Sequence, residues 1–160
     1  MIRPVELADC KAITEIYNYY IETTVVTFEE VPLTVSEMHN RVNEIHKNFP
    51  YLVYEEKEEI LGYAYVHAFH ARSAYRFTLE DSIYVRNGCQ GKGMGKALLD
   101  ALLNEVKKLD THSIMALIAL PNDSSIKLHE AFGFKNTGTL KEVGKKFDKW
   151  LDVGYWELIL

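Results

Sequence analysis

Three glycines at alternate positions mark the stretch Gln90–Lys96, which leads directly into an apolar-periodic helix. The first four N–H groups of an α-helix have no partner within the helix, and the helix dipole adds partial positive charge at this end. Because Gly91, Gly93 and Gly95 carry no Cβ, an anion can approach these N–H groups closely. The stretch therefore predicts an anion site at a helix start. A glycine-rich turn without a ligand is the alternative.

The size and composition of the chain favour one globular domain that covers residues 1–160. Hydrophobic residues make up 48% and charged residues 26%, as in ordinary soluble proteins. A formal net charge of −5 argues against a general nucleic-acid binder. Cys10 and Cys89 have no metal-like spacing and suit a reduced compartment. Because the sequence shows neither a signal-peptide pattern nor an apolar run as long as a membrane span, we expect a cytoplasmic protein without a membrane partner.

The hydrophobic pattern predicts helices and strands that alternate without a linker. The expected helices cover residues 6–24, 34–48, 93–109 and 124–132, and the expected strands cover residues 2–3, 51–56, 60–69, 80–86, 113–120 and 150–160. Thr34 followed by Glu37 is typical of a capped helix start. Four lysines before the last strand are expected in a solvated loop: Lys141, Lys145, Lys146 and Lys149.

Two nucleotide-binding motifs resemble the glycine stretch only in part. In a Walker A loop the second glycine is five positions after the first and a hydroxyl residue follows the lysine, whereas Gly95 is four positions after Gly91 and Ala97 follows Lys96. A dinucleotide-binding fingerprint requires Gly-x-Gly-x-x-Gly near a first strand, which this stretch does not match. Neither motif is therefore the leading interpretation.

The hexapeptide Gln90-Gly91-Lys92-Gly93-Met94-Gly95 fits the Gln/Arg-x-x-Gly-x-Gly/Ala signature of the GNAT N-acetyltransferases. Four further stretches resemble one branch, the phosphinothricin N-acetyltransferases: "IYNYYIETTVVTFE", "ARSAYRFTLEDSIYV", "IALPNDSSIKLHEAFGF" and "KWLDVGYWEL". The resemblance covers nearly the whole chain. It implies a mixed α/β fold in which a mostly antiparallel central sheet splays apart for acetyl-CoA and helices cover both faces.

The same resemblance implies that the bound anion is the pyrophosphate of acetyl-CoA, which would be the cosubstrate. The backbone of one strand would pair with the pantetheine arm as an added strand pairs with an open sheet edge. Asn122 matches a cofactor-contacting position, and it can equally serve as a helix N-cap. The implied cofactor residues are Ile83, Tyr84, Val85, Gln90, Gly91, Lys92, Gly93, Met94, Gly95, Lys96 and Asn122.

Two residues are implied in catalysis. Glu80 matches the glutamate of the family in "TLEDSIYV" and would act as the base for the amine; a solvated strand-end charge is the alternative. Asp81 suits this role less because neighbouring strand residues point to opposite faces. His129 stands where many GNAT enzymes have a tyrosine that protonates the leaving thiolate. It would act as that acid, contact the cofactor, or simply pack on its helix face.

The acceptor site is implied by residues from two loops, namely Phe28, Arg72, Ser73 and Tyr75. Arg72 would contact a carboxylate or phosphinate, and a plain surface arginine is the alternative. His67 and His70 are too few for a metal site, so we predict no metal.

The predicted reaction is acetyl transfer from acetyl-CoA to the α-amino group of a small amino-acid-like acceptor. Phosphinothricin and methionine sulfoximine are the acceptors that the resemblance suggests. Both inhibit glutamine synthetase, so detoxification is the implied purpose, and family members commonly form homodimers. The alternatives are an enzyme for another amine, a protein N-terminus or a lysine, and a non-catalytic acyl-CoA-binding regulator. A nucleotide-hydrolysing enzyme is a more distant third.

Overall fold

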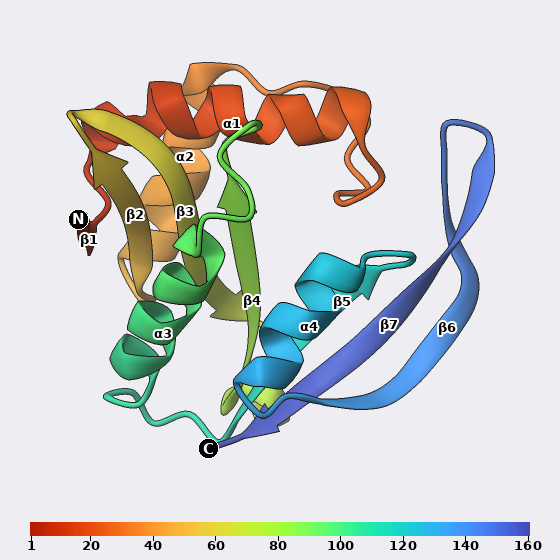
Figure 1. Cartoon of the computed structure of the whole chain (residues 1–160). Helices are drawn as coiled ribbons and strands as arrows, with labels where there is room; N and C mark the ends of the chain where they lie inside the picture. Colours follow the sequence, from red (N-terminus) through yellow and green to blue (C-terminus); the bar gives the residue numbers. More distant parts are fainter.

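Seven strands form one mixed sheet in the computed structural model, which describes residues 1–160 (Figure 1). The strands are β1 (Ile2–Pro4), β2 (Tyr51–Glu56), β3 (Glu59–Ala68), β4 (Thr78–Val85), β5 (Ser113–Ala119), β6 (Lys135–Lys146) and β7 (Lys149–Ile159). The helices are α1 (Cys10–Thr23), α2 (Val35–His46), α3 (Met94–Val106) and α4 (Asp123–Ala131), with 3₁₀ turns at η1 (Leu7–Asp9) and η2 (Ser73–Tyr75). The strand order is β1-β2-β3-β4-β5-β7-β6, and only the β4–β5 pair is parallel. The predicted mixed α/β fold with a mostly antiparallel sheet is therefore confirmed.

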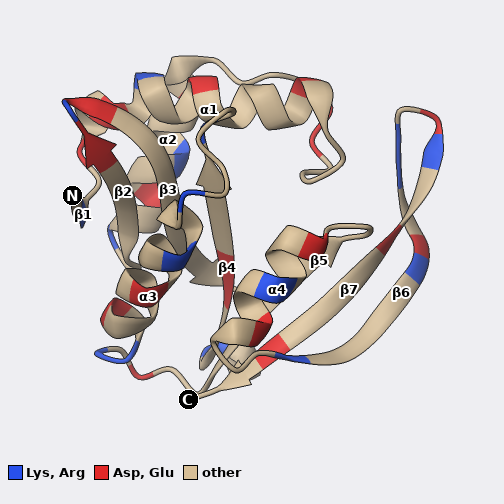
Figure 2. Cartoon of the chain, viewed as in Figure 1, with Lys and Arg blue, Asp and Glu red and all other residues tan.

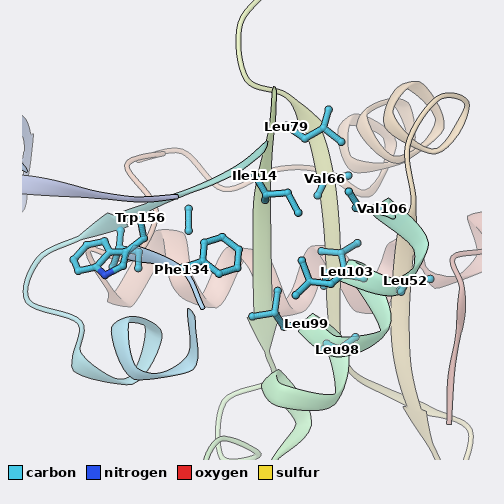
Figure 3. Packing of buried hydrophobic residues seen from close by; sticks show 14 residues of the cluster. Leu52, Val66, Leu79, Leu98, Leu99, Leu103, Val106, Ile114, Phe134 and Trp156 are labelled. Atoms are coloured by element: carbon cyan, nitrogen blue, oxygen red, sulfur yellow. The ribbon is translucent and has the colours of Figure 1, made fainter. Parts of the chain in front are cut away.

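Two hydrophobic clusters hold the helices against the two faces of the sheet. One cluster joins α1 and α2 to β2 and β3, and the other joins α3 to β2–β5 and β7. Figure 3 shows the apolar side chains of α3, such as Leu99 and Leu103, directed toward the strands. The apolar periodicity predicted this buried face, and its five residues are all buried: Leu98, Leu99, Leu102, Leu103 and Val106. No helix is both long enough and apolar enough to cross a membrane.

Helix α2 begins as its sequence predicts. The Thr34 hydroxyl accepts the Glu37 N–H at 3.2 Å, and the Glu37 carboxylate accepts the Thr34 N–H at 2.7 Å. These two bonds form a capping box, which satisfies helix donors that would otherwise lack a partner. Met38 and Val42 of this helix pack in the cluster with α1, which places α2 on the same face of the sheet.

Strands β4 and β5 part from one another halfway along their length. They pair at Thr78–Ser113, Leu79–Ile114 and Glu80–Met115 only. Beyond Glu80, β4 continues to Val85 and β5 continues to Ala119, but no further residues pair. The sheet is therefore open beyond Glu80, on the side where the glycine stretch and α4 lie (Figure 1).

The expected lysine loop before the last strand is wrong, because residues 135–146 form β6 and pair with β7 along most of their length. Nearly all side chains of β6 are exposed, so the strand lacks the apolar alternation that normally reveals one. Lys146 is only 2% exposed, and its Nζ donates to the Thr27 carbonyl at 2.8 Å. Figure 2 shows acidic and basic residues along the β6–β7 hairpin. Among them, Lys141 forms an ion pair with Asp152 at 2.8 Å.

Candidate active site

A cavity of about 820 Å³ occupies the opening between β4 and β5. Side chains from α1 and its following loop, β3, β4, β5, the glycine stretch and α4 line it. Ten of the eleven cofactor residues implied by the sequence lie on its wall: Ile83, Tyr84, Val85, Gln90, Gly91, Gly93, Met94, Gly95, Lys96 and Asn122. Lys92 is exposed and lies outside the wall. The structure thus gathers residues from three separate segments around one space.

The glycine stretch adopts a conformation that side chains disfavour. Gly91 has a φ of 76° and Gly93 a φ of 82°, both in the left-handed region. Gly93 is the N-cap of α3 and no side chain caps this helix, so its first N–H groups face the cavity mouth without a side-chain partner. Basic residues lie in this loop and first helical turn, coloured blue in Figure 2. The arrangement is suited to an anion.

The backbone of β4 presents free donors to the opening. The Arg86 N–H donates to the Leu61 carbonyl at 2.8 Å, on the β3 side of the strand. Because backbone groups alternate between the two edges of a strand, the N–H groups of Ile83 and Val85 point to the opposite edge, where β5 has separated. The Val85 carbonyl on this edge accepts the Tyr20 hydroxyl at 2.6 Å. Sequence reasoning did not single out Tyr20, whose partner is 65 positions away.

Glu80 is the last residue of β4 that still pairs with β5, and its side chain reaches the cavity wall. Its carboxylate lies 3.9 Å from Nε2 of His67, which is opposite it in the β3–β4 register. Burial raises the pKa of Glu80; the nearby His67 opposes this effect and the Asp81 charge adds to it, so the net shift is upward. A carboxylate with a raised pKa is a stronger base at neutral pH.

Asp81 and His129 form a buried pair that sequence reasoning missed. Nε2 of His129 lies 3.0 Å from a carboxylate oxygen of Asp81, and Nδ1 lies 2.8 Å from the Ser125 carbonyl. His129 is 5% exposed and Asp81 is 7% exposed. Burial lowers the pKa of His129, but the hydrogen bond and the charge of Asp81 outweigh it and raise the pKa overall. The expected packing of His129 is present as well, since its ring stands edge-on to Phe134 at 5.0 Å.

Asn122 performs the capping role that was the alternative to cofactor contact. Its side-chain oxygen accepts the Ser125 N–H at 3.2 Å and the Ser124 hydroxyl at 3.0 Å. Asn122 also lies on the cavity wall. Asn122 can therefore cap α4 and contact a ligand in the cavity at the same time.

The acceptor residues implied by the sequence are not brought together. Phe28 lies on the cavity wall, whereas Arg72, Ser73 and Tyr75 are exposed around η2 and lie outside it. Tyr65 and His67 from β3 occupy the wall near Glu80 instead. Their alternate positions in β3 indicate a shared face, but only the strand register shows that this face lies beside Glu80. Nowhere do three or more His, Cys, Asp and Glu side chains gather in a metal-like group.

Comparison with known sequences identifies relatives along nearly the whole chain. The family model described as an acetyltransferase (GNAT) domain matches residues 2–154. The chain is 39% identical to a phosphinothricin N-acetyltransferase of Streptomyces viridochromogenes, over 98% of this chain and 85% of the relative. It is 36% identical to the L-methionine sulfoximine/L-methionine sulfone acetyltransferase of Salmonella typhimurium, over 99% of this chain and 94% of the relative.

Comparison with solved structures agrees. A phosphinothricin acetyltransferase of the GNAT superfamily from Sinorhizobium meliloti, solved in complex with acetyl-CoA, superposes with a TM-score of 0.96 at 41% identity. The match covers 100% of this chain and 88% of the other. The opened sheet, the uncapped glycine stretch and the full-length relatives lead to one conclusion: the chain belongs to the GNAT acetyltransferase family, as an enzyme that takes its acetyl group from acetyl-CoA.

Proposed function

We propose that this protein transfers the acetyl group of acetyl-CoA to the α-amino group of a small amino-acid-like acceptor, of the phosphinothricin or methionine sulfoximine type. The observation that carries the proposal is the cavity between β4 and β5, which has the glycine stretch on its wall together with Glu80. The names of the full-length relatives support the acceptor class. Acetylation of such inhibitors would remove the positive charge of the amine and thus detoxify them.

For the donor, we propose that the pyrophosphate lies against the N–H groups of residues 90–96. The left-handed glycines and the uncapped start of α3 support this placement. The pantetheine arm would pair with the free backbone edge of β4 at Ile83 and Val85, in the place that a neighbouring strand would take. Lys92 would contribute through its backbone, since its side chain lies outside the cavity.

For the chemistry, we propose Glu80 as the base. Its carboxylate accepts a proton from the acceptor ammonium, and the neutral amine attacks the thioester carbonyl. The new C–N bond forms, and the Val85 N–H stabilises the oxyanion. The C–S bond then breaks, the second proton of the nitrogen passes through solvent to the departing sulfur so that coenzyme A leaves as the thiol, and Glu80 returns its proton to solvent. Because a free α-amine has a pKa of about 7.7–8.0, a base with a raised pKa suffices.

For the acceptor side, we propose that Phe28 and Tyr65 form the walls, because both line the cavity. Arg72, Ser73 and Tyr75 would contact the acceptor carboxylate after the η2 segment moves toward the cavity. We also propose a homodimer. Four large apolar side chains of the β6–β7 hairpin are about half exposed or more, and a partner would cover them: Leu140, Val143, Phe147 and Trp150.

The release of free coenzyme A from acetyl-CoA tests the proposal directly. The purified protein is assayed with phosphinothricin, methionine sulfoximine, the common amino acids, polyamines and a short peptide. Fast release with either of the first two supports the reaction and the acceptor class. Release with polyamines or the peptide alone overturns the acceptor class. Tight acetyl-CoA binding without release from any acceptor favours a non-catalytic acyl-CoA-binding protein.

A further inference from the structure

The Asp81–His129 pair lies where the backbone pairing between β4 and β5 ends. Glu80 is the last residue of β4 that pairs with β5, so Asp81 is the first residue beyond the last pair. His129 lies on α4, which follows β5 and packs against it (Figure 1). The contact between these side chains therefore connects the two halves of the sheet where their backbone pairing has just ended.

Both nitrogens of the His129 ring are occupied. A carbonyl oxygen only accepts, so the bond to Ser125 requires a proton on Nδ1. Nε2 faces the Asp81 carboxylate, and the two groups share a second proton. A ring held in this way at both ends, with 5% of its surface exposed, has no free N–H to offer a leaving thiolate.

We infer that Asp81 and His129 form a positioning pair that fastens α4 to β4 across the opening and fixes the cavity wall beside Glu80. This inference rests on the proposed acetyl transfer. In that reaction His129 acts through Asp81 and does not donate a proton to coenzyme A. The pair also controls the charge beside the base. A protonated His129 balances Asp81, and an unbalanced Asp81 carboxylate disfavours ionisation of Glu80 next to it.

Several other groups face Glu80 and must be accounted for in any pH profile. His67 and Tyr65 from β3 lie on the same cavity wall, and His70 from the following loop also acts on the Glu80 charge. None of them contacts His129, whose polar partners are Asp81 and Ser125 only. Changes at position 129 therefore reach Glu80 through Asp81.

Three variants test the inference: His129→Phe, His129→Gln and Asp81→Asn. His129→Phe keeps the packing on Phe134 but breaks the pair, and we expect acetyl-CoA affinity to fall about tenfold to hundredfold by calorimetry, as for the loss of a charged hydrogen bond. The acidic limb of kcat/KM should move to higher pH because Asp81 is left unbalanced. In Asp81→Asn the limb should move to lower pH, because the charge that raises the Glu80 pKa is gone. His129→Gln, which retains an N–H donor, should recover most of the affinity.

The controls separate this inference from the proposed function. His46 is exposed at the end of α2 and outside the cavity, so His46→Phe should change neither affinity nor pH profile. In the unliganded protein, NMR should show His129 still protonated above the ordinary histidine pKa of about 6.5, whether or not turnover occurs. A His129 that titrates at or below that value overturns the inference. The inference is also overturned if the His129→Phe enzyme keeps normal acetyl-CoA affinity and loses only the basic limb of the kcat profile, because that result identifies His129 as a proton donor.

Discussion

Glu80 shows how its place in a strand changes the acidity of one side chain. The residue lies where backbone pairing stops, so its carboxylate is shielded by the sheet on one side and faces the cavity on the other. Burial and the neighbouring Asp81 raise its pKa, and the partial opposition of His67 does not cancel this shift. A carboxylate that is half-buried in this way stays protonated to a higher pH than a free glutamate.

The first prediction concerns the variant Glu80→Gln. A base works only when ionised, so the rate of the parent enzyme should rise with pH through the raised Glu80 pKa. In the variant, kcat should fall about 10²–10⁴-fold. Its rate should no longer rise with pH through the Glu80 pKa, and only the ionisation of the acceptor amine should still affect the pH profile. The measurement is kcat/KM against pH, together with acetyl-CoA affinity, which should stay unchanged.

The matched control is Glu56→Gln, an exposed carboxylate at the end of β2 that lies outside the cavity. Its pH profile should equal that of the parent enzyme. An unaltered acidic limb in Glu80→Gln would contradict the assignment of this residue as the base.

At the scale of elements, the glycine stretch combines a backbone requirement with the binding role that we propose for it. A Cβ at Gly91 or Gly93 would meet no other atom within 4 Å, so steric room in the unliganded protein is not the reason for glycine there. The reason is the left-handed backbone, which costs other residues about 1–2 kcal/mol. The same conformation turns the first N–H groups of α3 toward the cavity mouth.

The second prediction compares Gly93→Ala with Gly88→Ala. Gly88 has a φ of 81°, close to that of Gly93, but it lies outside the cavity wall. Both variants should lose about 1 kcal/mol of unfolding free energy in denaturant titrations. Only Gly93→Ala should bind acetyl-CoA more weakly. When the strained backbone at position 93 relaxes, it moves the N–H groups that face the cavity, whereas Gly88 lies outside the cavity wall. Equal affinities in the two variants would count against the pyrophosphate site.

Strand β6 packs against the loop that follows α1. A Cβ at Gly144 would overlap the ring of Phe28, which lies on the cavity wall. Lys146 holds the same loop through the Thr27 carbonyl, and burial lowers the pKa of its ammonium. The hairpin thus supports the wall that we propose for the acceptor.

The third prediction uses this junction. Gly144→Ala should displace Phe28 and change the KM for the acceptor severalfold, while the KM for acetyl-CoA stays constant. Gly138→Ala is the matched control, since it lies in the same strand with no atom within 4 Å of the added Cβ. If both variants keep the parent acceptor KM, Phe28 is not part of the acceptor wall.

At the scale of the whole molecule, the β6–β7 hairpin carries several large apolar side chains that are exposed. It extends beyond the helices (Figure 1) and carries Trp150 at 62% and Phe147 at 52% exposure. Isolated exposed side chains are normal in soluble proteins, but a group of this size on one hairpin is typical of an interface.

The fourth prediction follows from this surface. Analytical ultracentrifugation should find a dimer for the parent protein and a folded monomer for Trp150→Glu, because a buried unpaired carboxylate opposes association. Leu109→Glu is the control, since Leu109 is exposed at 37% in the connection between α3 and β5. A parent protein that sediments as a monomer at micromolar concentration would rule out the proposed dimer.

The sequence by itself determined what depends on neighbours a few positions apart. The buried face of α3, the Thr34–Glu37 cap, the β2–β3 hairpin and the glycine-rich start of α3 all follow from local periodicity or residue preference. Family resemblance added the opened sheet and the donor, which the structure and the full-length relatives confirm.

Only the tertiary structure decided the contacts between distant segments. Strand β6 has no apolar alternation and exists because β7 supplies its hydrogen bonds. Lys146 is buried by a loop 119 positions away, and Asp81 meets His129 across 48 positions. Arg72 remains outside the cavity despite its matching motif. The sequence around a polar residue does not indicate its distant partner, because burial and charge pairing arise only once the chain has folded.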